Sequence, residues 1–293
     1  MNSNIIKLNT VPTFTGRRNQ EQNFESFKNF TEKTNFRKYL PKLIASEENY
    51  LSEGAFGITF TIPKNDNFIL KVYKNINLNL LNQGRLSLEK VPDDIPEINV
   101  GQPIARFGHY ISVLIKQEGQ EYGIPLHASV LTNRETTNLY ISNLKKVAAI
   151  PQEGYRQFTE EVKLVRKHGY YLDIWNSNNF LLTDKNINIV DIGKIQGIGN
   201  KFKSRISHAA LLRALADEHT LRELLPTLNK EDSAQIGKQL GIISNKLTIA
   251  MKQSKLPTLI VFNKIIAYLR DLINPLKYER IESIINRLIK FSK

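Results

Sequence analysis

Apolar residues recur with two different periods along the chain, and the change of period divides it into two parts. In the first part, short β-type runs occupy residues 58–62, 68–73 and 110–116, and turn residues separate them. Ahead of these runs, residues 21–50 carry phenylalanine and leucine at helical spacing, which predicts an N-terminal helical segment packed on the sheet behind it. The pattern predicts an α+β fold.

The second part of the chain is predominantly helical. Residues 153–167 have apolar side chains on one side of a helix, which we expect to end at His168 and Gly169. One β-hairpin interrupts the helices, with strands at residues 180–182 and 187–190 and a polar turn at 183–186. Further helices are predicted at residues 209–224, 230–252, 258–272 and 278–291.

Composition limits the class of protein. The chain has 293 residues, of which 41% are hydrophobic and 24% charged, as in ordinary globular chains. No apolar run approaches the roughly 18 residues of a membrane span, so we expect none. We also find no apolar segment of the kind that forms a cleaved signal peptide. The absence of cysteine excludes disulfides, thiolate metal sites and cysteine nucleophiles.

The chain is basic, with 41 Lys and Arg against 28 Asp and Glu and a formal charge of +13. Such a balance fits a polyanionic or acidic partner, and it fits equally a solvated basic surface without a partner. No dense basic run is interleaved with aromatic residues, so nucleic acid is not the expected partner.

Three polar residues flank the predicted hairpin, two before it and one after it. Asn178 follows Asp173 by five residues, and Asp191 follows Asn178 by thirteen. The hairpin would bring all three to one end of a rigid element. One carboxylate can orient a hydroxyl and take its proton, while a second carboxylate and an amide oxygen can bind Mg²⁺. Any one of the three alone could equally be a turn or cap residue.

A glycine-rich turn opens the first part of the chain. Gly54, Ala55, Phe56 and Gly57 precede the strand at 58–62, and such a turn lets backbone amides approach phosphate oxygens. Most turns of this kind bind nothing. Here Lys71 follows on the next strand, seventeen residues after Gly54.

Two glutamates complete the candidate site. Glu89 lies in a predicted helix at residues 80–90, and we expect it to form an ion pair with Lys71. Glu97 is its competitor, and an exposed helix charge is the alternative role for Glu89. Glu118 lies in the segment 117–119, which we expect to connect the two parts and to meet adenine through its backbone.

From Leu51 to about Gly193 the chain resembles the protein-kinase-like superfamily. Five motifs occur in the order of that family: the glycine-rich loop, Lys71, Glu89, Asp173 with Asn178, and Asp191-Ile192-Gly193. By its brevity and divergence the chain resembles most the small kinases that bacteria secrete into host cells as effectors.

The resemblance implies a two-lobed fold with a β-rich N-terminal lobe and a helical C-terminal lobe. Residues 1–20 would be a disordered or delivery segment, residues 21–118 the N-lobe with its helical extension, and residues 119–293 the C-lobe. The cofactors would be ATP and Mg²⁺.

The resemblance also assigns roles. Lys71, positioned by Glu89, would hold the α- and β-phosphates. Asp173 would orient the acceptor hydroxyl, and Asn178 with Asp191 would bind Mg²⁺.

The chain departs from the family in several places. Trp175 stands where the family has a lysine near the γ-phosphate, and Leu172 stands where it has the arginine that receives an activation-loop phosphate. Activation by loop phosphorylation is therefore not expected. The basic residues Lys201, Lys203 and Arg205 lead instead to the hypothesis that a host protein or a polyanion such as an inositol polyphosphate orders the site.

Besides a nucleic-acid binder, which would rest on charge alone, three functions stay open on the sequence. The first is a kinase of Ser, Thr or Tyr in a host protein, secreted by a bacterium into the host cytoplasm. The second is a kinase-fold enzyme that phosphorylates a small molecule or lipid, or that transfers AMP. The third is a binding module without catalysis, although retention of Lys71, Asp173, Asn178 and Asp191 argues against it.

Overall fold

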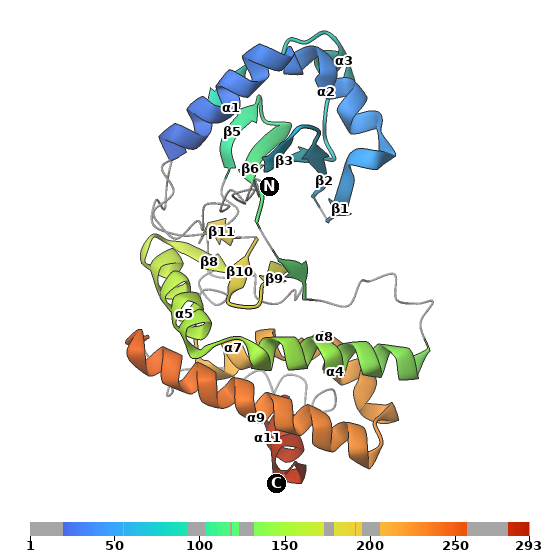
Figure 1. Ribbon diagram of the computed structural model, residues 1–293, viewed down its shortest axis with the longest axis vertical. Helices are drawn as coiled ribbons and strands as arrows, with labels where there is room; N and C mark the ends of the chain where they lie inside the picture. Colours follow the sequence, from blue (N-terminus) through green and yellow to red (C-terminus); the bar gives the residue numbers. More distant parts are fainter. Residues whose placement is uncertain are drawn as a thin grey trace, which may run out of the picture.

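The chain forms an α+β fold with an antiparallel sheet in its N-terminal part and helices in its C-terminal part (Figure 1). The structure is a computed structural model, and it describes residues 20–54, 56–92, 103–117, 119–122, 132–172, 179–190, 192–194, 206–256 and 281–292. The predicted fold class, with a β-rich N-terminal lobe and a helical C-terminal lobe, is confirmed. Buried apolar residues form one cluster within residues 27–113 and another within residues 122–288.

In the part of the chain that the structure describes, the large sheet has six strands in the order β1-β2-β3-β6-β5-β4. All of its pairs are antiparallel. The strands are β1 (Tyr50–Glu53), β2 (Gly57–Ile62), β3 (Asn65–Tyr73), β4 (Leu88–Lys90), β5 (Pro103–Phe107) and β6 (Ile111–Ile115). Alternation along β3 buries Phe68, Leu70 and Val72 on one face.

Two helices cover that apolar face, as the periodicity of residues 21–50 predicts. They are α1 (Gln20–Thr34) and α2 (Phe36–Ala45), and they lie above the sheet in Figure 1. The ring of Phe27 is fully buried and lies 5.7 Å from Phe36 and 5.3 Å from Phe68, with edge-on geometry in both pairs. This packing leaves the opposite face of the sheet, which carries Lys71, turned away from α1 and α2.

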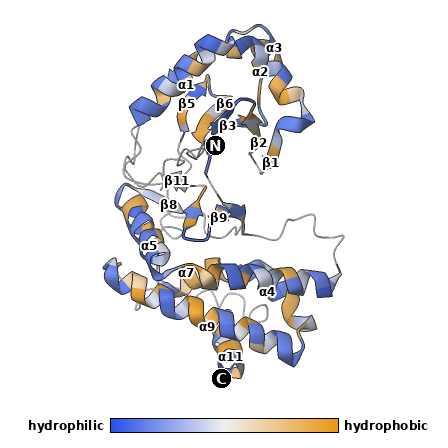
Figure 2. Cartoon of the chain, viewed as in Figure 1, coloured by the Kyte–Doolittle hydropathy of each residue, from blue (hydrophilic) through white to orange (hydrophobic). Residues whose placement is uncertain are grey.

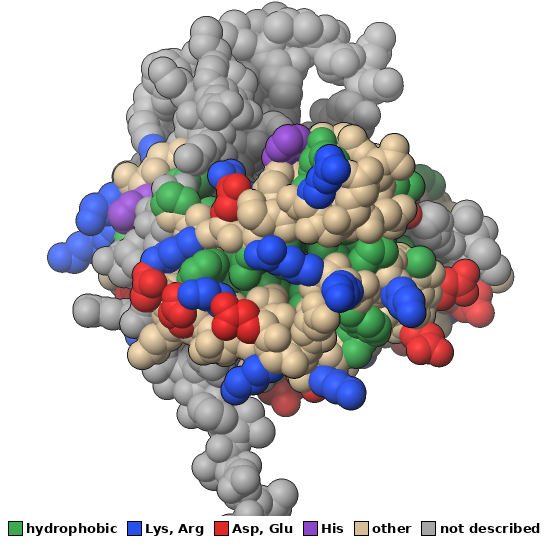
Figure 3. All heavy atoms as spheres, turned by 90° about the horizontal axis from the view of Figure 1, so that it is seen from above, with side chains coloured by type: hydrophobic (Ala, Val, Ile, Leu, Met, Phe, Trp, Pro, Cys, Tyr) green, Lys and Arg blue, Asp and Glu red, His purple; other side chains and the backbone are tan. Residues whose placement is uncertain are grey.

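The outer surface of α1 and α2 carries side chains of both charges. Figure 3 shows the molecule from the side of α1 and α2, and its Lys and Arg side chains are interspersed with acidic and hydrophobic ones. The face therefore lacks, among its described residues, the uniform basic surface that binds a nucleic-acid backbone.

Two small sheets follow in the chain. β7 (Gln120–Glu121), β9 (Phe180–Leu182) and β10 (Ile187–Ile189) form one sheet, in the order β10-β9-β7. β8 (Tyr170–Leu172) and β11 (Ile192–Lys194) form the other. The hairpin predicted at residues 180–190 is confirmed, and its turn is closed by a hydrogen bond of 3.0 Å from the Thr183 amide to the Asn186 carbonyl.

The helical part packs around α9 (Lys230–Gln253), which contacts α4 (Asn133–Ala149), α5 (Gln152–Lys167) and α11 (Ile281–Phe291). Helices α1, α4 and α9 each carry hydrophilic and hydrophobic positions along their length in Figure 2, as expected for amphipathic helices. Helices α9 and α11 pack closely at Gly237, where a built Cβ atom would lie 1.8 Å from the carbonyl oxygen of Leu288. Only glycine allows α9 and α11 to approach so closely.

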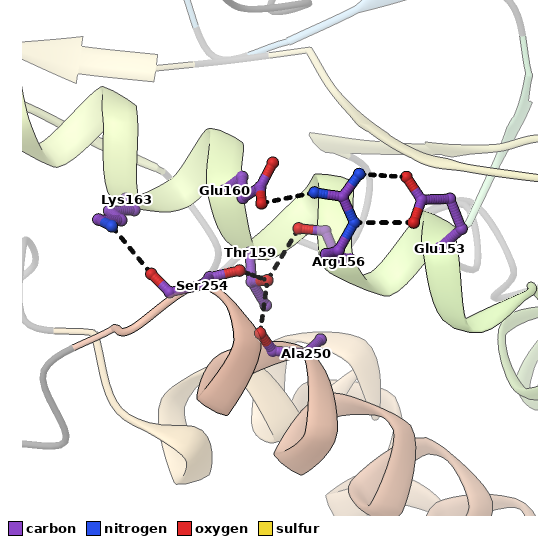
Figure 4. A network of polar contacts seen from close by, with 7 residues as sticks. All are labelled: Glu153, Arg156, Thr159, Glu160, Lys163, Ala250 and Ser254. Carbon is purple, nitrogen blue, oxygen red and sulfur yellow. Dashed lines mark hydrogen bonds and ion pairs between the residues drawn. The ribbon is translucent and has the colours of Figure 1, made fainter.

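A polar network joins α5 to the end of α9 (Figure 4). The Thr159 hydroxyl is fully buried and lies 2.6 Å from the Ser254 hydroxyl, and the Lys163 ammonium donates to the Ser254 carbonyl over 2.9 Å. Arg156 binds Glu153 and Glu160 on the outer side of α5. The bonds of Thr159 and Lys163 to Ser254 join α5 to the end of α9, whereas the Arg156 bonds lie within α5.

Two predicted helices differ from the structure. The helix expected at residues 209–224 is divided into α7 (His208–Leu215) and α8 (Glu218–Leu224), because Asp217 adopts a left-handed conformation with φ 45°. The helix expected at 80–90 is only α3 (Leu78–Asn82), because Gly84 ends it with φ 62°. The predicted helix at 258–272 lies outside the described residues.

None of the described helices is long and apolar enough to cross a membrane.

Candidate functional site

The two small sheets bring together the chain neighbours of the three predicted polar residues. Leu172, which precedes Asp173, pairs with Ile192, which follows Asp191. In the other sheet Phe180 pairs with Ile189, and the Val190 amide donates to the Asn179 carbonyl over 2.9 Å. Only one residue separates Val190 from Ile192, and two residues span at most about 7 Å.

Asp173, Asn178 and Asp191 themselves lie outside the described residues. The strand register nevertheless fixes the backbone on both sides of Asp191, immediately before Asp173 and immediately after Asn178. These four anchor points lie close together at the ends of the paired strands, while the meeting of the three polar side chains stays a prediction.

The hairpin that carries these anchors is held by its own core side chains. Phe180, Leu182, Ile187 and Ile189 are buried, and the Phe180 ring lies 6.0 Å from Phe158 of α5. The burial alternates, so Leu181 and Asn188 lie on the other side of the hairpin.

Helix α5 also supports the turn of the hairpin. A Cβ atom built at Gly154 would lie 2.1 Å from the carbonyl oxygen of Lys185. The helix can approach the turn this closely only because residue 154 has no side chain. The packing of α5 therefore sets the position of the hairpin.

Asn179 is a candidate that the spacing argument missed. It is partly exposed and lies in a 3₁₀-type turn just before β9, and its carbonyl accepts from the Val190 amide. A second amide thus lies directly beside the predicted ligand Asn178. The signal for it in the sequence was the pair of adjacent asparagines at 178 and 179.

The connector between the large sheet and the small one is short. The chain leaves β6 at Ile115 and enters β7 at Gln120, which pairs with Leu182. Gly119 has φ 132°, and a Cβ atom built there would lie 2.9 Å from the Leu181 Cβ. A glycine is therefore required at this position, while Glu118, predicted to meet adenine, lies outside the described residues.

Tyr122 anchors the end of this connector. It is buried, its amide donates to the Phe180 carbonyl over 3.1 Å, and its hydroxyl donates to the Leu215 carbonyl. Its own carbonyl accepts from the Asn143 side chain over 2.8 Å. Burial raises the pKa of Tyr122 well above its ordinary value, and nearby Tyr140 and Asp217 raise it further, so the phenol stays protonated as a donor.

The glycine-rich turn lies between β1 and β2. The Gly54 amide donates to the Gly57 carbonyl over 2.9 Å, and the Lys74 amide donates to the Phe56 carbonyl over 3.0 Å. Phe56 is 77% exposed, and Ala55 lies outside the described residues. A Cβ atom built at Gly57 would lie 2.6 Å from the Val72 carbonyl oxygen, whereas one at Gly54 would meet nothing closer than 3.9 Å. Only Gly57 is thus required by the packing of the hairpin.

Lys71 lies on β3, opposite Thr59 of β2 and Ser112 of β6. Directly paired residues in an antiparallel sheet project from the same face, which here is the face away from α1 and α2. The predicted position of Lys71, on the strand after the glycine-rich turn, is therefore observed.

The predicted partner of Lys71 is wrong. Glu89 lies on the edge strand β4 instead of a helix, and its carboxylate accepts from the Arg106 Nε over 2.9 Å. The register runs from Lys71 through Ser112 and Arg106 to Glu89. Three strand spacings of about 4.8 Å separate Lys71 from Glu89, or about 14 Å, which is too far for an ion pair. Glu97, the competitor, lies outside the described residues.

No group of three or more His, Asp or Glu side chains that could hold a metal occurs within the described ranges. The predicted metal ligands Asn178 and Asp191 lie outside those ranges, so the anchors at Asn179, Val190 and Ile192 are the part of that site that the structure describes.

Comparisons with known proteins add little to this geometry. No protein-family model matches the chain, and no curated protein matches it. Among solved structures, the ADP-bound aminoglycoside phosphotransferase APH(2'')-Ib aligns with 86% of this chain and 95% of its own, with 14% identity and a TM-score of 0.26. A likeness at this score carries no weight for the site.

Proposed function

We propose that the protein is a phosphotransferase of the protein-kinase-like type that uses ATP and Mg²⁺. The observation that carries the proposal is the pairing of Leu172 with Ile192, together with the bond from Val190 to Asn179. These contacts fix the backbone next to Asp173, Asn178 and Asp191, two carboxylates and an amide whose spacing in the sequence resembles that of kinases. Lys71, on the strand behind a glycine-rich turn, is the second supporting feature.

The residues fit the two cofactors. Oxygen ligands from Asp191 and from an amide at 178 or 179 suit Mg²⁺, which prefers carboxylate and carbonyl oxygens. Gly57 is needed for packing against Val72, whereas a Cβ atom at Gly54 would meet nothing closer than 3.9 Å. The backbone amides of such a glycine-rich turn can approach phosphate oxygens. When bound, ATP supplies the phosphoryl group and Mg²⁺ offsets the charge on its oxygens.

The remaining chemistry belongs to side chains of this protein. Lys71 would bind phosphate oxygens and stabilise negative charge that grows on the transferred group. Asp173 would accept a hydrogen bond from the acceptor hydroxyl and take its proton. Trp175, where kinases have a lysine, leaves one cation fewer near the γ-phosphate, so we expect slow transfer.

The acceptor that we propose is a Ser, Thr or Tyr hydroxyl of a host protein, reached after secretion of this protein by a bacterium into the host cytoplasm. We further propose that a host protein or an inositol polyphosphate activates it, since the chain lacks an arginine before Asp173. Transfer to a small molecule or lipid, and transfer of AMP, are the alternatives.

The test is incorporation of label from γ-³²P-ATP with Mg²⁺, with and without eukaryotic cell extract. Wild type is compared with Lys71→Ala and Asp191→Ala. Label that appears only with wild type supports phosphotransfer, and a requirement for extract supports a host substrate or activator. Label from α-³²P-ATP would identify AMP transfer instead. Absence of both label and nucleotide binding would refute the proposal.

A further inference from the structure

The surroundings of Lys71 differ from those that the resemblance implies. The ladder across the sheet runs Thr59, Lys71, Ser112, Arg106, Glu89, and all five residues project from the same face. Glu89 stands at the far end and is bound to Arg106. The two ladder positions next to Lys71 are therefore filled by hydroxyl side chains, those of Thr59 and Ser112.

A third hydroxyl comes from β3 itself. Tyr73 lies two residues after Lys71 and so projects from the same face. Its hydroxyl lies 3.2 Å from the hydroxyl of Ser112, in a contact that crosses diagonally from β3 to β6. Ser112 is only 8% exposed and Tyr73 is half-buried, so the contact is partly buried. The diagonal contact passes beside Lys71, because Lys71 is the direct partner of Ser112.

Tyr73 also connects this pair to the glycine-rich turn. It is the ladder partner of Gly57, and the next residue, Lys74, donates its amide to the Phe56 carbonyl. One side chain thus links the base of the proposed phosphate-binding turn to the strand position opposite Lys71. A change at Tyr73 is expected to affect both.

We propose that Tyr73 and Ser112 are positioning residues that hold the Lys71 side chain for a nucleotide phosphate, in place of Glu89. This proposal rests on the proposed function. An ammonium group has three hydrogen-bond donors, and a hydroxyl oxygen accepts from it without cancelling its charge. A lysine whose rotamers are restricted by the Tyr73 ring and by two neighbouring hydroxyls loses less conformational entropy when it binds phosphate.

The test uses conservative variants that remove one hydroxyl each, Tyr73→Phe and Ser112→Ala. We expect each to raise the KM for ATP about fivefold, the size of effect that loss of one neutral hydrogen bond produces, with a smaller change in kcat. Ser112→Thr keeps the hydroxyl and is expected to restore wild-type KM. Tyr110→Phe removes a hydroxyl from a partly buried tyrosine of the adjacent turn and is the matched control.

A double-variant cycle separates positioning from a merely structural role. If Tyr73 acts through Lys71, then Tyr73→Phe should not weaken ATP binding further when Lys71 is already alanine. Binding is measured as the ATP-induced shift in melting temperature, and the melting temperature without ATP monitors folding. If Ser112→Ala fails to fold, Tyr73→Phe carries the test alone.

The outcomes distinguish the two proposals. If Lys71→Ala binds ATP as wild type does, the assignment of Lys71 fails, and with it the support that the site lends to the proposed function. If Lys71→Ala no longer binds ATP but Tyr73→Phe and Ser112→Ala bind ATP as wild type does, only the positioning role is overturned. If Tyr73→Phe weakens ATP binding equally in the wild-type protein and in the Lys71→Ala variant, the positioning role is also overturned.

Discussion

Leu172 and Ile192 lie directly opposite each other in an antiparallel pair, although twenty positions separate them in the chain. The next residue after the first is Asp173, and the residue before the second is Asp191. This pairing is the reason to treat the two aspartates as parts of one site, and it makes their roles testable.

Replacement of either aspartate by asparagine should abolish phosphotransfer without unfolding the protein. Asp191→Asn removes a charge that Mg²⁺ needs, so nucleotide binding should lose its dependence on Mg²⁺. Asp173→Asn removes the group that accepts the proton, and it should leave Mg²⁺-dependent binding unchanged. Titration of ATP with and without EDTA, followed by melting temperature, checks both. Equal behaviour of the two variants would contradict the separate roles.

Asn178 and Asn179 compete for the role of amide ligand, and a matched pair of alanine variants decides between them. The spacing from Asp173 favours Asn178. The partial exposure of Asn179 and the bond that joins its backbone to Val190 favour Asn179. We expect one of the two variants to raise the Mg²⁺ concentration needed for ATP binding at least about tenfold, as loss of a direct ligand does, and the other to match wild type. If neither variant changes it, the amide ligand lies elsewhere.

Gly154→Ala should destabilise the protein by about 1–3 kcal/mol, because the new Cβ would overlap the Lys185 carbonyl and force α5 away from the hairpin. Chemical denaturation measures the loss. Gly241→Ala is the control, since a Cβ built there meets only a side-chain methyl of Ile289 at 3.7 Å. In a helix interior that substitution should stabilise by about 0.5–1 kcal/mol. A neutral Gly154→Ala would mean that the turn moves freely.

Gly119→Ala should weaken both folding and nucleotide binding. The residue has φ 132°, which alanine adopts at a cost of about 1–3 kcal/mol, and the added Cβ would meet Leu181 and the Leu182 carbonyl. Gly84→Ala is a useful comparison, because Gly84 also has a positive φ of 62° but has no atom within 4 Å of a built Cβ. A larger effect at Gly119 would locate the cause in the contact between connector and hairpin.

Glu89→Gln should leave the affinity for ATP unchanged, because Glu89 binds Arg106 about 14 Å from Lys71. The Glu89 and Arg106 side chains are both about half exposed, so the stability should fall by no more than about 1 kcal/mol. A large rise in the KM for ATP would show that Glu89 reaches Lys71 in the nucleotide-bound protein, as the resemblance to kinases implies.

Local sequence patterns were sufficient for most elements of the fold. The β-type run at residues 68–73 predicts β3, and the near-helical spacing of phenylalanine and leucine in residues 21–50 predicts the helices on its apolar face. The hairpin at 180–190 follows from two apolar runs and a polar turn. Each of these signals depends on residues within a few positions of one another, so periodicity and turn chemistry report them directly.

Contacts between distant residues were decided only by the tertiary structure. The partner of Glu89 depends on where an edge strand joins the sheet, and a short segment such as 80–90 fits a helix or a turn and strand about equally well until Gly84 and the pairing with β5 select one. The need for glycine at 119, 154 and 237 arises from atoms far away in the sequence. The hydroxyls beside Lys71 likewise come from three strands, because the register of a sheet, and not the local sequence, determines which side chains become neighbours.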